Sequence, residues 1–336
     1  MRCSLLMVSV LLPQLVMAQQ VPPPIIDMHL HASQVADFAA LMGGRLPVPH
    51  CVPMTDYPIP ESGARWMEVF GSANPPCTAI RSAMSDSALL ARTLAIMERR
   101  NIIGLTSGPG LAAWVRAAPD RVIPSLGFAG GPESPAPDSL RAWFGAKRFA
   151  ALGEVTIQYG GMEPDDSSMR RYWALAEELQ VPVGIHIGTG PVGAPYVGPF
   201  SRYRARLHSP LLLEEVLVRH PKLRVFIMHA GWPMLDDLLA VLWAHPHVYV
   251  DVGVLDWALP RVEFHRYLQR IVEAGFGKRV MFGSDQMIWP EAVEMALQSI
   301  ETAAFLTPEQ KRDVLYNNAA RFLRLTPQEI AKHHGR

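Results

Sequence analysis

Two histidines separated by a single residue, His29 and His31, end a short apolar run in the stretch PPIIDMHLHAS. Successive side chains of a strand point to opposite faces, so Asp27 is expected beside the histidines, facing inward. The other face, packed on surrounding helices, would carry Ile26, Met28 and Leu30. Imidazoles and carboxylates that converge in this way are typical ligands of a divalent metal ion. The pair alone is weak support, because the chain contains 12 histidines and chance produces such spacings.

Four later residues could complete a metal site. They lie in or directly after other apolar runs: Glu154, His186, His229 and Asp285. Each also has a simpler interpretation, as a hydrogen-bonded core histidine, a paired carboxylate or a turn residue. Burying all of these polar groups without partners would be costly. A divalent cation would compensate the whole set.

Apolar, β-branched segments alternate with amphipathic segments along the chain. The predicted strands span residues 25–31, 102–108, 121–128, 150–159, 182–189, 224–231, 248–254 and 280–286. The predicted helices span residues 85–99, 111–117, 138–143, 167–179, 211–219, 235–244, 263–274 and 291–303. This order predicts an α/β fold, a (β/α)8 TIM barrel, with a doubly wound open sheet as the alternative. Active sites of such barrels lie at the C-terminal ends of the strands, where the candidate ligands would converge.

Two segments depart from this alternation. Residues 33–80 form a long, proline-rich insertion after the first strand, far longer than an ordinary connection and suited to a lid. Residues 308–325 predict an extra C-terminal helix that packs outside the barrel. We therefore expect a single barrel domain over residues 19–336.

The first residues have the pattern of a secretory signal peptide. Arg2 precedes an apolar stretch, and small-residue cleavage geometry follows at residues 16–18. An uncleaved anchor is the alternative, but the apolar run is short and interrupted. Removal of residues 1–18 would leave two cysteines in an oxidising compartment, the periplasm or the exterior, and there we expect a Cys51–Cys77 disulfide.

Composition excludes some classes of partner. Lys and Arg together number 31, and so do Asp and Glu, so the formal net charge is zero. Without a basic patch we expect no nucleic-acid partner, and after signal cleavage no stable membrane anchor. A small-molecule substrate is the expected partner, and the chain could also form a homo-oligomer.

Several motifs together resemble the amidohydrolase superfamily of metal-dependent hydrolases. DMHLH, VPVGIH, MHAGWP, MFGSD and NNAARFL are most similar to the amidohydrolase-related branch that also contains decarboxylases. The resemblance implies that His29, His31 and Asp285 hold a first metal. It implies that His186 is a further ligand, and that His229 either binds a second metal or polarises the substrate. Glu154 resembles the bridging carboxylate of TatD-like deoxyribonucleases and other binuclear members.

The implied cofactor is one or two divalent ions, most simply zinc, with manganese or iron fitting the same donors. Such an ion lowers the pKa of water toward neutrality. Asp285 would then accept the proton of the nucleophile, and His229 would act on the scissile carbonyl. Asp27 would support the ligands from behind.

The loop after the fifth strand carries Arg202, Arg204 and Arg206, which could clamp a substrate carboxylate or phosphate or could simply face solvent. Trp232 could line the pocket, as could Trp257 and Trp289, although core packing is an equal interpretation. The predicted activity is hydrolysis of an amide, ester or lactone by an exported enzyme. The alternatives are a decarboxylase of the same family, a TatD-like nuclease and a non-catalytic secreted binding protein.

Overall fold

The computed structural model describes residues 22–55, 65, 68–69, 72–131, 134–196 and 198–335. The predicted signal peptide and part of the insertion lie outside the described residues. Eight parallel strands form one sheet in chain order. They are β1 Ile25–His31, β4 Ile102–Ser107, β5 Val122–Phe128, β6 Ala151–Val155, β7 Val183–His186, β8 Val225–Met228, β9 Tyr249–Asp251 and β10 Val280–Met281.

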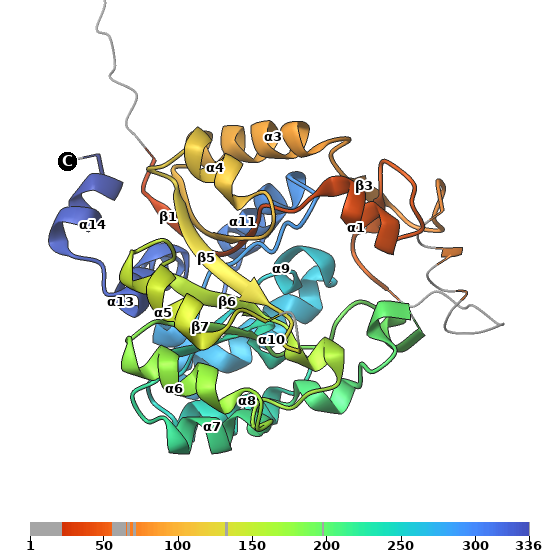
Figure 1. The fold of residues 1–336 in the computed structure, drawn as a ribbon. Coiled ribbons are helices and arrows are strands. Elements are labelled where there is room, and N and C mark those ends of the chain that lie inside the picture. The colour runs from red at the N-terminus through yellow and green to blue at the C-terminus, as the bar shows by residue number, and fades with distance from the viewer. Residues whose placement is uncertain are drawn as a thin grey trace, which may run out of the picture.

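The sheet curves into a barrel (Figure 1). Its first and last strands meet where the Met28 N–H donates to the carbonyl oxygen of Phe282 at 2.9 Å. The predicted TIM barrel is therefore confirmed, and the alternative of a doubly wound open sheet is wrong. The last five strands, β6 to β10, are all shorter than predicted, because the chain turns at their ends into segments that build the site. One of these is the helical turn η1 Ile157–Gly160.

Helices follow the strands and surround the barrel. They are α3 Asp86–Arg99, α4 Leu111–Ala117, α5 Pro137–Gly145, α6 Arg170–Glu178, α7 Glu214–Arg219, α8 Leu235–Ala244, α9 Leu255–Ala258, α10 Arg261–Ile271 and α11 Glu291–Glu301. In α3, Ser85 caps the first turn by accepting from the Ala88 N–H, and Leu89, Ile96 and Met97 are buried at helical spacing. Among the described residues, no helix combines the length and apolarity needed to cross a bilayer.

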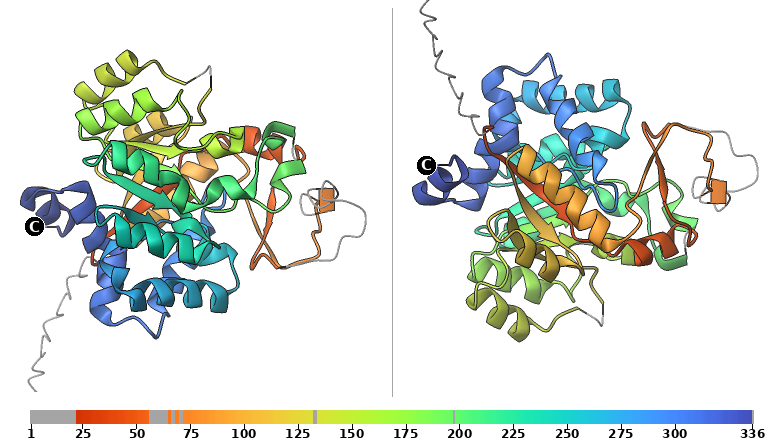
Figure 2. Two further views of the ribbon diagram at one scale, coloured as in Figure 1. Left: turned by 90° about the horizontal axis from the view of Figure 1, so that it is seen from below. Right: turned by 90° about the horizontal axis from the view of Figure 1, so that it is seen from above.

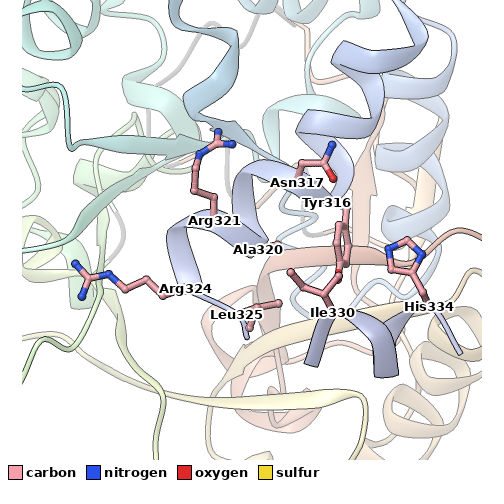
Figure 3. Close-up of a pocket in the computed structure, with 8 residues that line it drawn as sticks. All are labelled: Tyr316, Asn317, Ala320, Arg321, Arg324, Leu325, Ile330 and His334. Carbon is pink, nitrogen blue, oxygen red and sulfur yellow. The ribbon is translucent and has the colours of Figure 1, made fainter. Parts of the chain in front are cut away.

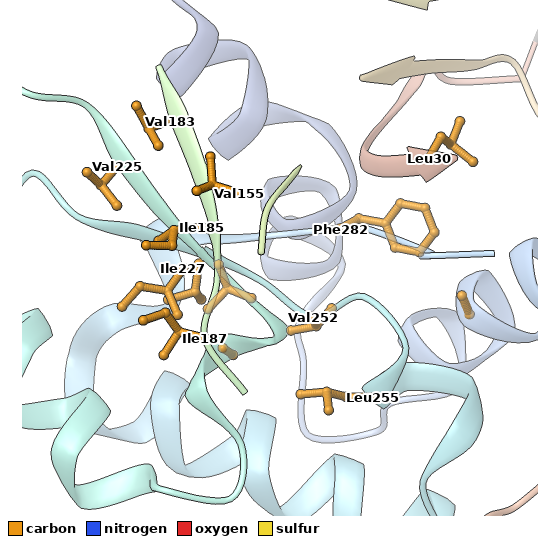
Figure 4. Close-up of a cluster of buried hydrophobic side chains, with 14 of the residues drawn as sticks. Leu30, Val155, Val183, Ile185, Ile187, Val225, Ile227, Val252, Leu255 and Phe282 are labelled. Carbon is orange, nitrogen blue, oxygen red and sulfur yellow. The ribbon is translucent and has the colours of Figure 1, made fainter. Parts of the chain in front are cut away.

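The outward faces of the strands form the main hydrophobic core. Ile185 in β7, Ile227 in β8 and Val252 directly after β9 project into this layer (Figure 4). All three side chains are at most 1% exposed, as expected for strands covered on both faces. This core fixes the strands whose ends carry the site.

The predicted alternation of β1 is wrong. Its pairing with β4 shifts register between Asp27 and Leu30, which marks a bulge. Ile26 and Met28 therefore belong to the cluster inside the barrel, with Phe226 and Met281, whereas Leu30 packs in the outer core. Because of the bulge, the consecutive residues Met28 and His29 both face the interior of the barrel. Asp27 therefore does not lie on the same face of β1 as the two histidines.

The insertion after β1 begins with helix α1 Val35–Leu41 and continues into a two-stranded antiparallel hairpin. The hairpin strands are β2 Pro49–Cys51 and β3 Ala79–Arg81, and the predicted Cys51–Cys77 disulfide closes it. Both views of Figure 2 show the hairpin projecting from one end of the barrel, away from the C-terminus. The insertion is thus tied to the rim on which the candidate ligands lie.

The C-terminal segment closes the opposite end. It comprises α12 Pro308–Arg312, the π-helical turn η9 Asp313–Asn317, α13 Asn318–Leu323 and α14 Pro327–His333. The predicted extra helix is present, but it is not an outer helix: Tyr316 and Phe322 pack against the interior residues Ile26 and Phe226. A cavity of about 500 Å³ between α13 and α14, beside Arg321 and Ile330, lies at this end (Figure 3).

Candidate active site

Six predicted ligands meet at the C-terminal end of the barrel. His29 and His31 end β1, Glu154 lies in β6, His186 ends β7, His229 directly follows β8, and Asp285 lies in the turn after β10. Both His229 and Asp285 have left-handed backbones, with φ of 62° and 46°. Non-glycine residues rarely adopt this conformation, and its presence at two site residues is typical of functional centres.

The imidazole of His29 is at the centre of this group. Its Nε2 lies 3.6 Å from Asp285 Oδ1 and 3.8 Å from Glu154 Oε2, and its Nδ1 lies 3.3 Å from Asp251 Oδ2. The ring is buried, and neither nitrogen makes a hydrogen bond. A buried imidazole that is surrounded by carboxylate oxygens without a formed hydrogen bond matches the environment of a metal ligand.

His31 and Asp285 form the second contact of the group. His31 Nε2 lies 3.0 Å from Asp285 Oδ1. The other carboxylate oxygen, Oδ2, lies on the side of His229, 4.0 Å from its Nδ1. Asp285 therefore has one oxygen at the histidine pair and a second toward His229, in the wall of the adjacent cavity.

Glu154 joins the remaining two histidines. The His186 Nδ1–H donates to Glu154 Oε1 at 2.6 Å, and His229 Nε2 lies 3.5 Å from the same oxygen. His229 Nδ1 donates to the Gly253 carbonyl at 2.9 Å, which orients the ring and directs Nε2 inward. This Nε2 also lies 3.0 Å from His186 Nδ1.

Within the cluster, the pKa values of the two carboxyl groups are lowered and that of the His29 imidazole is raised. Burial raises the pKa of Glu154, but its interactions with His186, His229 and His29 hold that pKa well below its usual range. Burial likewise raises the pKa of Asp285, and His29 and His31 lower it overall. Burial lowers the pKa of His29, yet Asp285 and Asp251 raise it well above the usual value. Both carboxylates stay ionised at neutral pH, and imidazoles supply the compensating protons.

The donor set fits a divalent cation. Two groups of three residues place ligand atoms within 4.8 Å of one another: His29, His31 and Asp285, and His29, Glu154 and His229. Imidazole nitrogen with carboxylate oxygen suits zinc, manganese or iron. The unpartnered nitrogens of His29 also favour a cation between these side chains.

Asp27 supports the histidines through the backbone. Its Oδ1 accepts from the His29 N–H at 2.9 Å and from the Ser284 N–H at 3.0 Å, so it ties β1 to the segment that carries Asp285. Burial raises the pKa of Asp27 to about 7. This carboxyl holds the backbone of the site together rather than contacting an imidazole ring.

Sequence reasoning missed three positions. Asp251, at the end of β9, contacts the His29 ring and accepts from the N–H groups of His229 and Gly253. Gln286 exchanges two hydrogen bonds with the backbone of His31. At Gly283 a Cβ would lie 2.9 Å from that of His29, so no side chain fits there. The sequence does carry a signal for Asp251: in VYVDVG an acidic residue ends a predicted strand, as several of the candidate ligands do.

A cavity of about 540 Å³ opens beside the cluster. His186, His229 and Asp285 form part of its wall, and the insertion contributes His50 and Cys51. Of the two interpretations left open for the tryptophans, Trp232 and Trp289 line the cavity, whereas Trp257 donates to the Ser284 carbonyl from outside the lining.

The arginines of the loop after β7 point elsewhere. Arg204 donates to the carbonyls of Ser201 and Tyr203, Arg206 pairs with Glu163, and Arg202 lies beside Gly161. All three arginines are exposed, and the described cavity lining includes none of them. The structure therefore gives no contact between these arginines and the candidate site.

The amidohydrolase family profile matches residues 26–325. The chain belongs to this family. No curated protein sequence matches it.

Solved structures share the fold at low identity. An uncharacterised TIM-barrel protein of Bordetella bronchiseptica has a TM-score of 0.61 at 17% identity, covering 93% of this chain and 100% of that one. A 5-carboxyvanillate decarboxylase of Novosphingobium aromaticivorans, crystallised with manganese, has a TM-score of 0.57 at 14% identity, covering 91% and 98%. A probable 2-pyrone-4,6-dicarboxylic acid hydrolase of Acinetobacter baumannii has a TM-score of 0.54 at 14% identity, covering 90% and 99%.

Proposed function

We propose that this protein is a metal-dependent hydrolase that cleaves a carbonyl substrate, an ester, lactone or amide, with water. The observation that carries the proposal is Asp285, an ionised carboxylate in the cavity wall, 3.0 Å from His31 and 3.6 Å from His29. The family and the buried set of nitrogen and oxygen donors support the same class of enzyme.

We propose one divalent ion per chain, held by His29, His31 and Asp285. The second group, with Glu154 and His229, also depends on His29. The Nε2 of His29 faces both carboxylates, and a single nitrogen binds a single ion. Zinc suits these donors best, and a neighbouring fold crystallised with manganese makes manganese the first alternative to test.

When bound, the ion supplies Lewis-acid activation of water and of the carbonyl group. Asp285 accepts the proton of the attacking water and passes it to the leaving oxygen or nitrogen. His229, protonated at both ring nitrogens, keeps Nδ1 on the Gly253 carbonyl and donates from Nε2 to the oxygen on which negative charge develops. The buried Glu154 favours this protonated form, because its hydrogen bond to His229 helps to raise the pKa of the imidazole against the effect of burial.

The test uses zinc-reconstituted protein with neutral probes, phenyl acetate and dihydrocoumarin. Asp285→Asn should lower kcat by roughly 10²–10⁴-fold, the usual contribution of acid–base catalysis. Metal content is measured on the same sample, so that loss of the ion is separated from loss of proton transfer. The exposed Arg206→Ala variant is the control and should keep full activity. Unchanged turnover in Asp285→Asn would contradict the proposal.

Non-oxidative decarboxylation is the second candidate, because a neighbour of the same fold is a decarboxylase. It predicts release of carbon dioxide from an aromatic acid without uptake of oxygen from water. Incubating the protein with 2,6-dihydroxybenzoate and 5-carboxyvanillate measures this activity directly.

We also propose that the protein is exported. The pattern of residues 1–18 and the Cys51–Cys77 disulfide support this location, since disulfides persist in oxidising compartments. Mass spectrometry of the protein from a periplasmic extract should find a mature chain that begins near residue 19.

A further inference from the structure

The insertion after β1 places a histidine, His50, in the wall of the cavity. Several contacts fix its position. The Trp289 indole N–H donates to the Val48 carbonyl at 2.9 Å, which ties the start of the hairpin to the barrel, and the disulfide closes the hairpin itself. The ring of His50 packs against those of Trp257 and Trp289, with its centroid 4.8 Å from each. His50 is therefore held in place before any ligand binds.

One hydrogen bond determines what the ring of His50 offers to a ligand. Its Nδ1 lies 2.9 Å from the Cys51 carbonyl oxygen, which can only accept, so Nδ1 carries the proton. In the neutral ring Nε2 is then an acceptor that carries no hydrogen. This Nε2 has no hydrogen-bond partner among the described residues and is not a buried atom, so it remains open at the cavity wall.

Neighbouring polar groups of the lining behave differently. Both of its indole N–H groups already donate to oxygen atoms of the protein. Hydroxyl groups, such as those of Tyr159 and Thr189, can either donate or accept, so they accommodate either kind of ligand group. The neutral ring of His50 can only accept through Nε2. His50 therefore differs from these neighbours in that it selects for a hydrogen-bond donor.

We propose that His50 is a specificity-determining residue, whose Nε2 accepts a hydrogen bond from a hydroxyl or N–H group on the body of the substrate. An apolar group at that position would displace water and leave Nε2 without a partner, and an unsatisfied acceptor is costly. The inference rests on the proposed function in taking this cavity as the substrate site, but binding alone measures the preference.

Two pairs of ketones, which are not hydrolysed, test the preference in ligand-observed NMR titrations of zinc-reconstituted protein. The meta and para isomers of (hydroxymethyl)acetophenone are compared with the same isomers of ethylacetophenone, which have nearly the same shape and lack the donor. The titrations are run at pH 8, where an imidazole with the ordinary pKa of about 6.5 is neutral. Each pair gives a ratio of dissociation constants, ethyl over hydroxymethyl. Comparing this ratio between proteins cancels the difference in hydrophobicity of the ligands.

Two substitutions separate the acceptor from the packing of the ring. In His50→Gln the side-chain amide oxygen reaches the position of Nε2, so this variant keeps an acceptor there. In His50→Asn the shorter amide reaches only the position of Nδ1, so it can donate to the Cys51 carbonyl but offers no acceptor to the ligand. For at least one isomer pair, the ratio should fall by about 3- to 10-fold in His50→Asn and stay within about twofold of the wild type in His50→Gln.

Two results would overturn the inference. One is a ratio that His50→Asn leaves unchanged for both isomer pairs. The other is an equal loss in the two variants, because the ring would then act through its packing and not through Nε2.

Turnover tests the proposed function separately. The same zinc-loaded proteins are given the meta and para isomers of (hydroxymethyl)phenyl acetate, and release of acetate is followed. Absence of enzyme-dependent hydrolysis, with the binding ratio lost in His50→Asn and kept in His50→Gln, would overturn the hydrolase and keep the inference. Hydrolysis by the wild type, with the same binding ratio in all three proteins, would overturn the inference and keep the hydrolase.

Discussion

The Nδ1 of His29 lies 3.3 Å from the Oδ2 of Asp251, while its Nε2 faces Glu154 and Asp285. A carboxyl behind a metal-binding imidazole orients the ring and raises its basicity. The same Asp251 accepts from the backbone N–H of His229, so one side chain aligns two histidines of the site.

Replacing this carboxyl should weaken metal binding without unfolding the protein. We expect Asp251→Asn to lower zinc affinity by about 10- to 100-fold, as measured by competition with a chromogenic chelator. Asp256→Asn is the matched control: Asp256 is also buried, and burial raises the pKa of its carboxyl well above the usual value, but it makes no ion pair with a described histidine. Equal losses in the two variants would show that burial, not contact with His29, determines the effect.

Substrate binding should depend on Trp232 and not on Arg204. Trp232 lines the cavity, whereas Arg204 donates to backbone carbonyls of its own loop. Steady-state kinetics with phenyl acetate should show KM raised by about 5- to 30-fold in Trp232→Ala, since an aromatic contact of roughly 1–2 kcal/mol is lost. Arg204→Ala should match the wild type. The opposite order would restore the arginine clamp suggested by the sequence.

His50 should make stability depend on pH. Burial between the two indoles outweighs the opposite effect of Asp285 and lowers its pKa from 6.5 to about 4. Between these values the unfolded chain binds more protons, so stability contributed by His50 is complete above pH 6.5 and is lost as pH falls toward 4. The loss should be about 1–2 kcal/mol, because the ring is only partly shielded from water.

Urea unfolding at pH 7 and at pH 4.5 measures this loss in the wild type and in His50→Gln, which does not titrate. The difference between the two proteins isolates His50 from the carboxyl groups of the site. A pH dependence identical in both proteins would rule out the buried neutral imidazole.

The C-terminal segment should be essential for stability. The ring of Phe322 lies 5.4 Å from that of Phe226 and 5.0 Å from that of Tyr249, so it closes the end of the barrel opposite the site. Phe322→Ala should lower the free energy of unfolding by about 3–5 kcal/mol. The exposed Val218→Ala is the control and should change it little. A small effect at Phe322 would mean that this end is closed by other residues.

The barrel and the principal site residues could be predicted because each carries a local signal. Every candidate ligand follows or lies in an apolar run, and parallel strands bring those ends to one rim. The same reasoning failed for β1, where hydrogen bonding decides the register. The bulge between Asp27 and Leu30 places Ile26 and Met28 inside the barrel. The alternation of hydrophobic residues in the sequence does not show where such a bulge lies.

Other features depend on tertiary contacts that leave little trace in the sequence. Arg204 and a substrate-binding arginine have the same side chain, and only the position of the loop distinguishes them. His50 becomes neutral because two tryptophans distant in the chain enclose it. Asp251 ends a strand as Asp285 follows one, but its contact with His29 requires the closed barrel.

Hydrolysis in water enriched in heavy oxygen tests the central claim most directly. Zinc-loaded protein is incubated with dihydrocoumarin, and the product acid is analysed by mass spectrometry, with a chelated sample in parallel. We predict one zinc ion per chain, one heavy oxygen in the new carboxyl group at an enzyme-dependent rate, and loss of that rate on chelation and in Asp285→Asn. Metal-loaded protein that incorporates no heavy oxygen, or that releases carbon dioxide from an aromatic acid instead, would contradict the assignment.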